Sequence, residues 1–178
     1  MQLYSSELKT PVGVMTAWVS DAGLYLFDFD HRRMLPAIQQ RILDYFGATV
    51  EEGPHPMIQT LQKQLDGYFD GSRQEFDIPL QLAGSPFQIK VWHGLLDIPY
   101  GQVRTYKQQS IHLGDEKAIR AVASANGANG IAIIIPCHRV VGANGTLVGY
   151  GGGLHRKKWL LSHEQRHSAK AYQQDLFA

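Results

Sequence analysis

The only cysteine of this 178-residue chain, Cys137, stands in a setting that favours a reactive thiol. It follows the aliphatic run Ile131–Ile135 and Pro136, and it precedes His138 and Arg139. A lone cysteine is more often a small buried apolar residue, so the neighbours decide the interpretation. Cationic neighbours lower the pKa of a thiol and favour the thiolate, which is the nucleophilic form. We therefore expect Cys137 to act as a nucleophile.

The order Cys137-His138 also limits how the two side chains can meet. Adjacent side chains of an extended segment point to opposite faces, so direct contact between ring and sulfur would need a turn. A bridging water is the easier arrangement. Cysteine proteases differ, because their base and nucleophile come from distant segments.

Helix-start signals precede this segment. Ser85 with Gln88, and Thr105 with Gln108, each have the spacing of a capping box. The two patterns predict one helix from about residue 86 and a second from about residue 106. The second helix is expected to run to about His112.

A third helix is predicted from its cap, Asp115, to about Asn126, with Gly127 beyond it. Two short helices joined by three residues that include Gly114 make a helix-turn-helix pattern. A tightly packed helical hairpin would show the same pattern. The later helix carries a long cation, Arg120, among small residues that allow close approach to DNA or to another helix: Ala118, Ala121, Ala123, Ser124 and Ala125.

The cysteine itself is expected to leave the end of a buried strand over residues 131–135, because the run is short, aliphatic and followed by proline. Glycines over residues 149–153 then predict a flexible loop. A final helix is expected from about Leu154, and it carries Glu164.

The N-terminal half predicts a small sheet with two helices. Strands are expected over residues 2–8, 14–19 and 24–29, with turns between them, and helices over residues 35–46 and 57–69. No cluster of nucleophiles, bases or ligands stands out there. We expect this half to be a scaffold with no chemistry of its own.

The charge distribution divides the chain in the same place. Residues 1–83 carry 6 Lys and Arg against 11 Asp and Glu, and residues 84–168 carry 10 against 4. We predict an N-terminal domain over 1–83, a second domain over 84–168 that carries the helix-turn-helix pattern and the cysteine, and a tail over 169–178. The imbalance suggests that only the second domain meets a polyanion, although two differently charged solvated faces would give the same sums.

Composition excludes several classes of protein. With 44% apolar and 19% charged residues the chain is globular rather than disordered. One cysteine allows no intrachain disulfide and no zinc site built on several thiolates. No apolar run is long enough to span a bilayer, and the N-terminus shows no signal pattern, so we expect a cytoplasmic protein.

A resemblance to a known family becomes specific at the cysteine. Pro136-Cys137-His138-Arg139-Val140 resembles the active-site signature of the O6-alkylguanine-DNA alkyltransferases, also called methylated-DNA–protein-cysteine methyltransferases. Ordered matches at the family's spacing extend over Pro86-Phe87-Gln88, Val91-Trp92, Ile98-Pro99-Tyr100-Gly101, Arg120-Ala121-Val122, Ala125-Asn126, Asn129, Gly149-Tyr150, Gly152-Gly153, Lys157, Leu160-Leu161 and Glu164.

The resemblance implies the fold and the function. The fold would be α+β, with a small N-terminal sheet-plus-helix domain before a mostly helical, winged-helix-like helix-turn-helix domain that carries the cysteine. The protein would flip O6-alkylguanine out of duplex DNA and transfer the alkyl group once to Cys137, with O4-alkylthymine as an open second substrate. It implies no cofactor and no metal, and a monomer without an obligate protein partner.

Roles carry over residue by residue. Cys137 would be the acceptor, His138 the base through a water, and Glu164 the group that orients the histidine. Tyr106 would displace the phosphate beside the target and assist protonation of the leaving base. Arg120 would fill the vacated stack, which suits a helix of small residues because flipping costs a few kcal/mol of stacking.

The remaining roles concern DNA and the flipped base. Further DNA contacts are expected from Arg104, Ala121 and Ser124. Asn129 would tie the recognition helix to the active-site turn, and Tyr150 would contact the base. Backbone groups of Cys137, Val140 and Gly151 would read the edge of the base.

Small residues predict a pocket that accepts alkyl groups larger than methyl. Ala132 and Gly151–Gly153 are the residues that the resemblance places around the alkyl group. The opposing effect is that a mobile glycine loop must be ordered on binding.

Two other functions stay open. His163-Glu164-Gln165-Arg166-His167 matches the H-E-x-x-H pattern of zinc proteases, with Asp175 as the sole further ligand candidate beyond it. A non-catalytic protein that only recognises alkylated DNA is the second alternative. Relatives of that kind replace the cysteine, which this chain retains.

Overall fold

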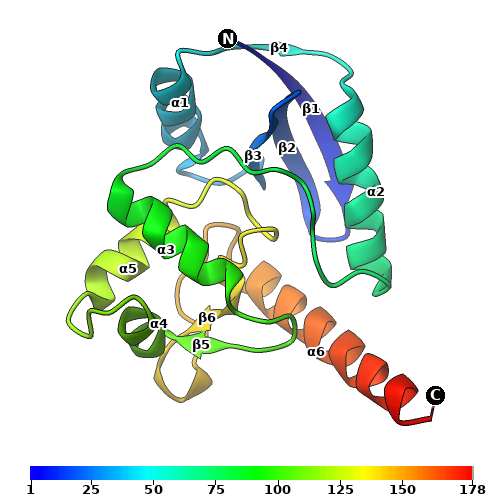
Figure 1. The fold of residues 1–178 in the computed structure, drawn as a ribbon, viewed down its shortest axis with the longest axis vertical. Coiled ribbons are helices and arrows are strands. Elements are labelled where there is room, and N and C mark those ends of the chain that lie inside the picture. The colour runs from blue at the N-terminus through cyan, green and yellow to red at the C-terminus, as the bar shows by residue number, and fades with distance from the viewer. Residues whose placement is uncertain (178) are drawn as a thin grey trace.

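The computed structural model describes the backbone of residues 1–177 and the side chains of residues 1–168. Its N-terminal half is a four-stranded sheet of order β3-β2-β1-β4 with two helices, and its C-terminal half is mostly helical (Figure 1). The N-terminal elements are β1 (Gln2–Thr10), β2 (Gly13–Ser20), β3 (Gly23–Phe29), α1 (Leu35–Phe46), β4 (Thr49–Glu52) and α2 (Pro56–Asp70).

The C-terminal half packs short helices around a two-stranded parallel sheet. Its elements are α3 (Pro86–Leu96), β5 (Arg104–Thr105), α4 (Tyr106–His112), α5 (Ile119–Gly127), the 3₁₀ turn η1 (Cys137–Arg139), β6 (Val140–Val141), the 3₁₀ turn η2 (Ala143–Gly145) and α6 (Leu154–Phe177). Together the halves give the expected α+β fold. Among the described residues no helix is both long and apolar enough to cross a membrane.

Strand β3 joins the two halves. Every residue of β3 is buried, because β3 lies between helix α1 and the C-terminal half. Its outer edge is paired rather than open. The amide of Phe27 donates to Gly130 O at 2.9 Å, and the amide of Ala132 donates to Phe27 O at 2.7 Å. The segment before the cysteine is thus bonded directly to the N-terminal sheet.

Local signals predicted most elements correctly. Both capping boxes form: Ser85 and Thr105 each accept from the backbone amide three residues ahead, and the glutamine there bonds back. The first three strands and helices α1 and α2 lie within two residues of their predicted bounds. Strand β4 was not predicted, because it is only four residues long and two of them are glutamates.

The start of α5 differs from the prediction. The Asp115 carboxylate accepts the backbone amide of Lys117 at 2.9 Å and closes a local turn instead of capping a helix. Aspartate side chains often compete with helix formation in this way. Helix α5 begins only at Ile119, without a side-chain cap, so the linker from α4 is longer than three residues.

The predicted strand over residues 131–135 is also wrong. Only Ile131 forms a bridge, to Phe27, and Ile133 has a φ of 71°, in the left-handed region that a β-branched side chain rarely adopts. All five residues are nevertheless buried. The segment winds through tight turns between the sheet and the helices. Its apolar residues are therefore explained by burial in the core and not by a β-strand. The domain division at residues 83 and 168 stays a prediction.

Candidate active site

Cys137 begins a 3₁₀ turn rather than an extended segment. The turn is closed by the Arg139 amide, which donates to Pro136 O at 3.0 Å, and by the Val140 amide, which donates to Cys137 O. His138 is fully buried, while Cys137 is half-buried. The expectation of an extended Cys-His segment is therefore corrected: the turn sends the ring into the protein and leaves the sulfur facing a cavity.

That cavity has a volume of about 190 Å³ and is built from both halves of the chain. A Cβ atom added to Gly151 would lie 2.4 Å from Arg32 Nε, and one added to Gly152 would lie 2.5 Å from the Phe29 ring. Glycine is therefore needed for the loop to approach β3. The lining residues are Asp28, Phe29, Arg32, Tyr106, Ala123, Asn126, Gly127, Ala132, Cys137, Gly149, Tyr150, Gly151 and Gly152.

Behind the cysteine, His138 is held by a buried carboxylate. His138 Nε2 lies 2.7 Å from Glu164 Oε1, which also accepts from the Tyr68 hydroxyl at 2.8 Å. Arg139 Nε donates to Glu164 Oε2 at 2.8 Å, and its Nη1 donates to Ile98 O at 2.7 Å. Arg139 thus neutralises Glu164. Its guanidinium is directed to that carboxylate and not to the thiol.

These contacts fix the protonation of the pair. Burial alone would raise the pKa of Glu164, but the His138 ring and hydrogen bonds from His138 and Arg139 hold that pKa well below its ordinary value. Burial lowers the pKa of His138. Neutral His138 therefore donates from Nε2 to an ionised Glu164. His138 Nδ1 has no partner among the described residues and is free to accept a proton.

The resting thiol is less acidic than the sequence suggested. Burial raises the pKa of Cys137 above its ordinary value, although a hydrogen bond from Asn129 and the charges of Arg32 and Lys157 oppose this. The adjacent cations were expected to lower that pKa, and this expectation is wrong because His138 is neutral and Arg139 is paired with Glu164. Cys137 needs a base to become a thiolate.

Asn129 lies beneath the cysteine turn and does not line the cavity. Its Nδ2 donates to Ile135 O at 3.0 Å and to Cys137 Sγ at 3.3 Å, and its Oδ1 accepts the Ile131 amide at 2.9 Å. One side chain therefore organises the turns of the 131–135 segment and orients the sulfur.

The loop over the cavity is fixed by two side chains. Lys157 Nζ donates to Val148 O at 3.1 Å and to Gly149 O at 3.0 Å, and the Tyr106 hydroxyl donates to Val148 O at 3.1 Å. Burial raises the pKa of Tyr106, and that of Tyr150 lies well above its ordinary value for the same reason. Both phenols stay protonated and can donate hydrogen bonds.

The predicted DNA contacts fall into two groups. Arg120, Ala121 and Ser124 are exposed on α5. Arg104 is half-buried, and its guanidinium already donates to Gln109 Oε1 at 2.9 Å and to Gly94 O at 3.3 Å. Val140 is fully buried in β6 and does not line the cavity, so only its backbone could reach a base.

Two features of the cavity were missed. The N-terminal half contributes Asp28, Phe29 and Arg32, so it is not the inert scaffold that was predicted. The available signal was Asp28 itself, a charge within an otherwise apolar strand. The second feature is Asn126 on α5, whose side-chain oxygen and nitrogen are buried without a partner among the described residues.

The H-E-x-x-H pattern does not form a metal site. Glu164 is engaged by His138 and Arg139, and the His163 ring bonds to Tyr68 O at 2.7 Å. Within the described part of the chain no group of three or more His, Cys, Asp or Glu side chains could hold a metal ion. Asp175 has no described side chain.

Comparison with known proteins agrees with this site. A family profile described as "6-O-methylguanine DNA methyltransferase, DNA binding domain" matches residues 86–166. A methylated-DNA–protein-cysteine methyltransferase of Mycolicibacterium paratuberculosis is 56% identical over 60% of this chain and 64% of its own length. The match thus spans under two thirds of that relative.

Longer matches cover both halves. The crystal structure of Mycobacterium tuberculosis O6-methylguanine methyltransferase superposes with a TM-score of 0.78 at 38% identity, over 93% of this chain and 94% of that one. The M. tuberculosis protein in complex with DNA superposes with a TM-score of 0.76 at 36% identity, over 94% of each chain. A Methanosarcina barkeri relative is 37% identical over 92% of this chain and 98% of its own length. Since that match spans both halves, the chain belongs to the methylated-DNA–protein-cysteine methyltransferase family.

Proposed function

We propose that this protein repairs DNA by transferring the alkyl group of O6-alkylguanine in a duplex to Cys137, once per molecule. One observation carries the proposal: the only thiol of the chain faces a cavity of about 190 Å³, and a buried His-Glu pair lies behind it. The names of the relatives support the same chemistry. O4-alkylthymine is a second candidate substrate. That the cavity accepts alkyl groups larger than methyl stays a prediction. Ala132, Gly151 and Gly152 line the cavity, and Gly153 does not.

The transfer would be a single displacement. The proton of Cys137 passes through a water to His138 Nδ1, and Glu164 stabilises the imidazolium that forms. The thiolate attacks the alkyl carbon, a carbon–sulfur bond forms, and the bond from that carbon to O6 breaks. The electron pair stays on the base, which takes up a proton from Tyr106 to become guanine. The proton held by His138 then returns through water to the Tyr106 oxygen, so that both side chains end neutral. The product is a thioether, which lacks an electrophilic carbonyl for water to attack, so the thiol is not regenerated.

DNA would be bound by the α4–α5 pair. We assign Arg120 to the gap left by the flipped base, with Ala121 and Ser124 close to the groove. Tyr106 would contact the neighbouring phosphate, and Tyr150 would contact the base with the backbone of Val140 and Gly151. Arg104 stays a predicted DNA contact. A phosphate would have to bind the same guanidinium that already donates to Gln109 on α4.

The experiment is intact-mass measurement after incubation with a duplex that carries O6-methylguanine. We expect one added methyl group per protein, located on Cys137, and no further turnover with excess duplex. An unmethylated duplex is the matched control, and Cys137→Ser should add no mass. Repeated turnover, or transfer in the serine variant, would contradict the proposal.

We further propose that the protein acts as a monomer without an obligate partner, because one chain contributes every residue named above. Its compartment would be the reducing cytoplasm, where a single thiol stays reduced. Sedimentation of the protein alone and with duplex should give one protein molecule per complex. A stable dimer in the absence of DNA would contradict this.

A further inference from the structure

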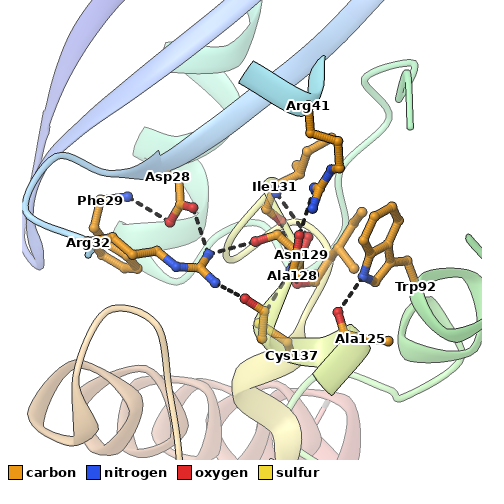
Figure 2. Close-up of polar contacts among 12 residues, drawn as sticks. Asp28, Phe29, Arg32, Arg41, Trp92, Ala125, Ala128, Asn129, Ile131 and Cys137 are labelled. Carbon is orange, nitrogen blue, oxygen red and sulfur yellow. Dashed lines mark hydrogen bonds and ion pairs between the residues drawn. The ribbon is translucent and has the colours of Figure 1, made fainter. Parts of the chain in front are cut away.

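The C-terminal end of α5 is held by donors from outside the helix. Trp92 Nε1 donates to Ala125 O at 2.8 Å. Arg41 Nη2 donates to Ala128 O at 2.8 Å, and the Arg41 guanidinium lies 5.4 Å from the centre of the Trp92 ring. Arg32 Nη2 donates to Gly127 O. Figure 2 shows both arginines reaching this end of the helix from the N-terminal half. Cations suit this position because the carbonyl end of a helix carries partial negative charge.

Arg32 is itself fixed by a buried carboxylate. Its Nη1 lies 2.7 Å from Asp28 Oδ2, and Asp28 is fully buried at the end of β3. The other carboxylate oxygen, Oδ1, accepts the Phe29 amide at 2.9 Å. The Phe29 amide therefore fixes the Asp28 carboxylate, and this carboxylate fixes the Arg32 guanidinium. The Arg32 side chain is left with little conformational freedom.

The same guanidinium leads to the cysteine. Arg32 Nη1 also donates to Asn129 O at 2.7 Å, and the Asn129 side chain donates to Cys137 Sγ at 3.3 Å. Asp28, Arg32 and Cys137 line one cavity. A continuous path of contacts thus runs from Asp28 through Arg32 and Asn129 to the sulfur (Figure 2).

We propose that Arg32 and Asp28 are positioning residues: through Asn129 and the end of α5 they hold the Cys137 thiol, and their opposite charges adjust its reactivity. The inference rests on the proposed function for its substrate only. Neither residue needs to touch the alkyl carbon.

The charges around the sulfur come from several elements. Arg32 favours the thiolate and Asp28 opposes it, and both line the N-terminal side of the cavity. Lys157 on α6 favours the thiolate, whereas Tyr106, Tyr150 and His138 are neutral. Loss of Arg32 should therefore make the thiol less reactive near neutral pH, and loss of the Asp28 charge should make it more reactive.

This difference in sign separates electrostatic control from simple support. Both Arg32→Gln and Asp28→Asn break the same buried ion pair, so each removes part of the support that the pair gives to Asn129 and to the end of α5. A residue that only held the fold would move the reactivity of the thiol in the same direction in both variants. Opposite directions require the charges themselves.

The test uses iodoacetamide as the probe, because the chain has a single thiol and its alkylation can be followed by mass across a pH series. We expect Arg32→Gln to alkylate roughly threefold to tenfold more slowly near neutral pH, and Asp28→Asn to alkylate faster by a similar factor. Their pH profiles should move to higher and lower pH respectively. Arg32→Lys keeps a charge and should lie between wild type and Arg32→Gln, which also serves if the glutamine variant does not fold.

Two controls match these variants. Arg33→Gln removes an exposed neighbouring charge and should leave the profile unchanged. Arg41→Gln removes another contact to the helix end and should lower the melting temperature with little shift of the profile. Unchanged profiles in both Arg32→Gln and Asp28→Asn, or shifts in one direction, would overturn the proposal.

The methyl-transfer rate from O6-methylguanine duplex should follow the same order among the variants. If wild type transferred no methyl group while iodoacetamide still showed the opposite shifts, the proposed substrate would be wrong and the positioning role would stand. If methyl transfer occurred without those shifts, the positioning role would be wrong and the proposed function would stand.

Discussion

At the scale of single residues, the site holds Cys137 as a protonated thiol beside a group that can remove the proton. Burial raises the pKa of Cys137, so the resting sulfur carries its proton. His138 is buried and neutral, its Nδ1 has no partner among residues 1–168, and Glu164 is ionised. The thiolate therefore forms only when His138 Nδ1 accepts the proton of Cys137.

Replacement of Glu164 by glutamine should slow methyl transfer by about 10²-fold, because the imidazolium that forms at His138 loses its counter-charge. The hydrogen bond from Tyr68 can persist, so the geometry is largely retained. Single-turnover rates with methylated duplex measure the effect. Gln165→Ala, at the exposed neighbouring position, is the control and should react as wild type. A near-normal rate in Glu164→Gln would show that His138 needs no carboxylate.

Asp28 gives the folding stability a pH dependence of its own. Burial raises the pKa of Asp28 to about 6, despite the opposing charge of Arg32. Between the ordinary aspartate pKa and about 6, the folded protein binds a proton that the unfolded chain has lost. Stability contributed by this group should therefore be present at low pH and fall as pH rises through that window.

Urea unfolding of wild type and Asp28→Asn across that window measures the contribution. The difference in unfolding free energy, wild type minus variant, should decrease as pH rises from about 4 to about 6 and then level off. Asp44→Asn, at an exposed position of α1, is the control for loss of one carboxylate. A difference that grew with pH would mean that the pair with Arg32 outweighs burial.

The Asn126 amide lies in the wall of the cavity and has no hydrogen-bond partner within the described part of the chain. A buried amide without a partner destabilises the fold, so Asn126→Leu should raise the unfolding free energy by about 1 kcal/mol. If the amide serves the flipped base, the same variant should slow methyl transfer. Thermal unfolding and single-turnover rates test the two effects together. A variant that was less stable, or equally fast, would contradict this reading.

At the scale of elements, α5 presents one face to the cavity and another to solvent. Arg120 is exposed while Val122 and Ala125 are buried. Helix α5 can therefore contact DNA without losing its core. Arg32 and Arg41 bind the C-terminal end of the same helix.

Arg120→Ala should slow repair of methylated duplex by about tenfold or more while leaving reaction with free O6-benzylguanine nearly unchanged, because only the duplex has a stack to fill. Lys158→Ala, an exposed site on α6, is the control for loss of one charge. Pseudo-first-order rates on the two substrates give the comparison. Equal losses on both would place Arg120 in a structural role.

The elements that the sequence predicted are those set by neighbours in the chain. A capping box needs only two residues three apart, and both examples form. The errors lie where distant contacts decide. Residues 131–135 are bent into turns by Asn129 and by the edge of β3, and no alternation within the segment reports those partners.

The active site divides in the same way. The motif around Cys137 identified His138 and, through the resemblance, Glu164. It could not show that Arg139 faces that carboxylate, because the direction of a side chain in a turn depends on what packs against it. Arg32 carries no local motif, and Asn126 lies in a family match that gave it no role; only the folded chain brings the two to the cysteine.

At the scale of the whole molecule, the charges are unevenly shared. The basic residues of the C-terminal half should release counterions when DNA binds, so affinity should fall as salt rises. A plot of log affinity against log salt for the Cys137→Ser variant on methylated duplex should have a modest negative slope. Lys9→Gln, in the acidic half, should not change that slope. Salt-independent binding would contradict the electrostatic reading.

The pairing of β3 with residues 130–132 makes the catalytic turn part of the sheet's hydrogen-bond network. The amides of Phe27 and Ala132 close this edge, and both lie in the shared interior. Neither can meet solvent unless the sheet and the segment before the cysteine separate. In native-state hydrogen exchange the two amides should therefore exchange at the same slow rate, through global unfolding alone. The turn that carries Cys137 would then unfold and refold in one cooperative step with the N-terminal half of the chain.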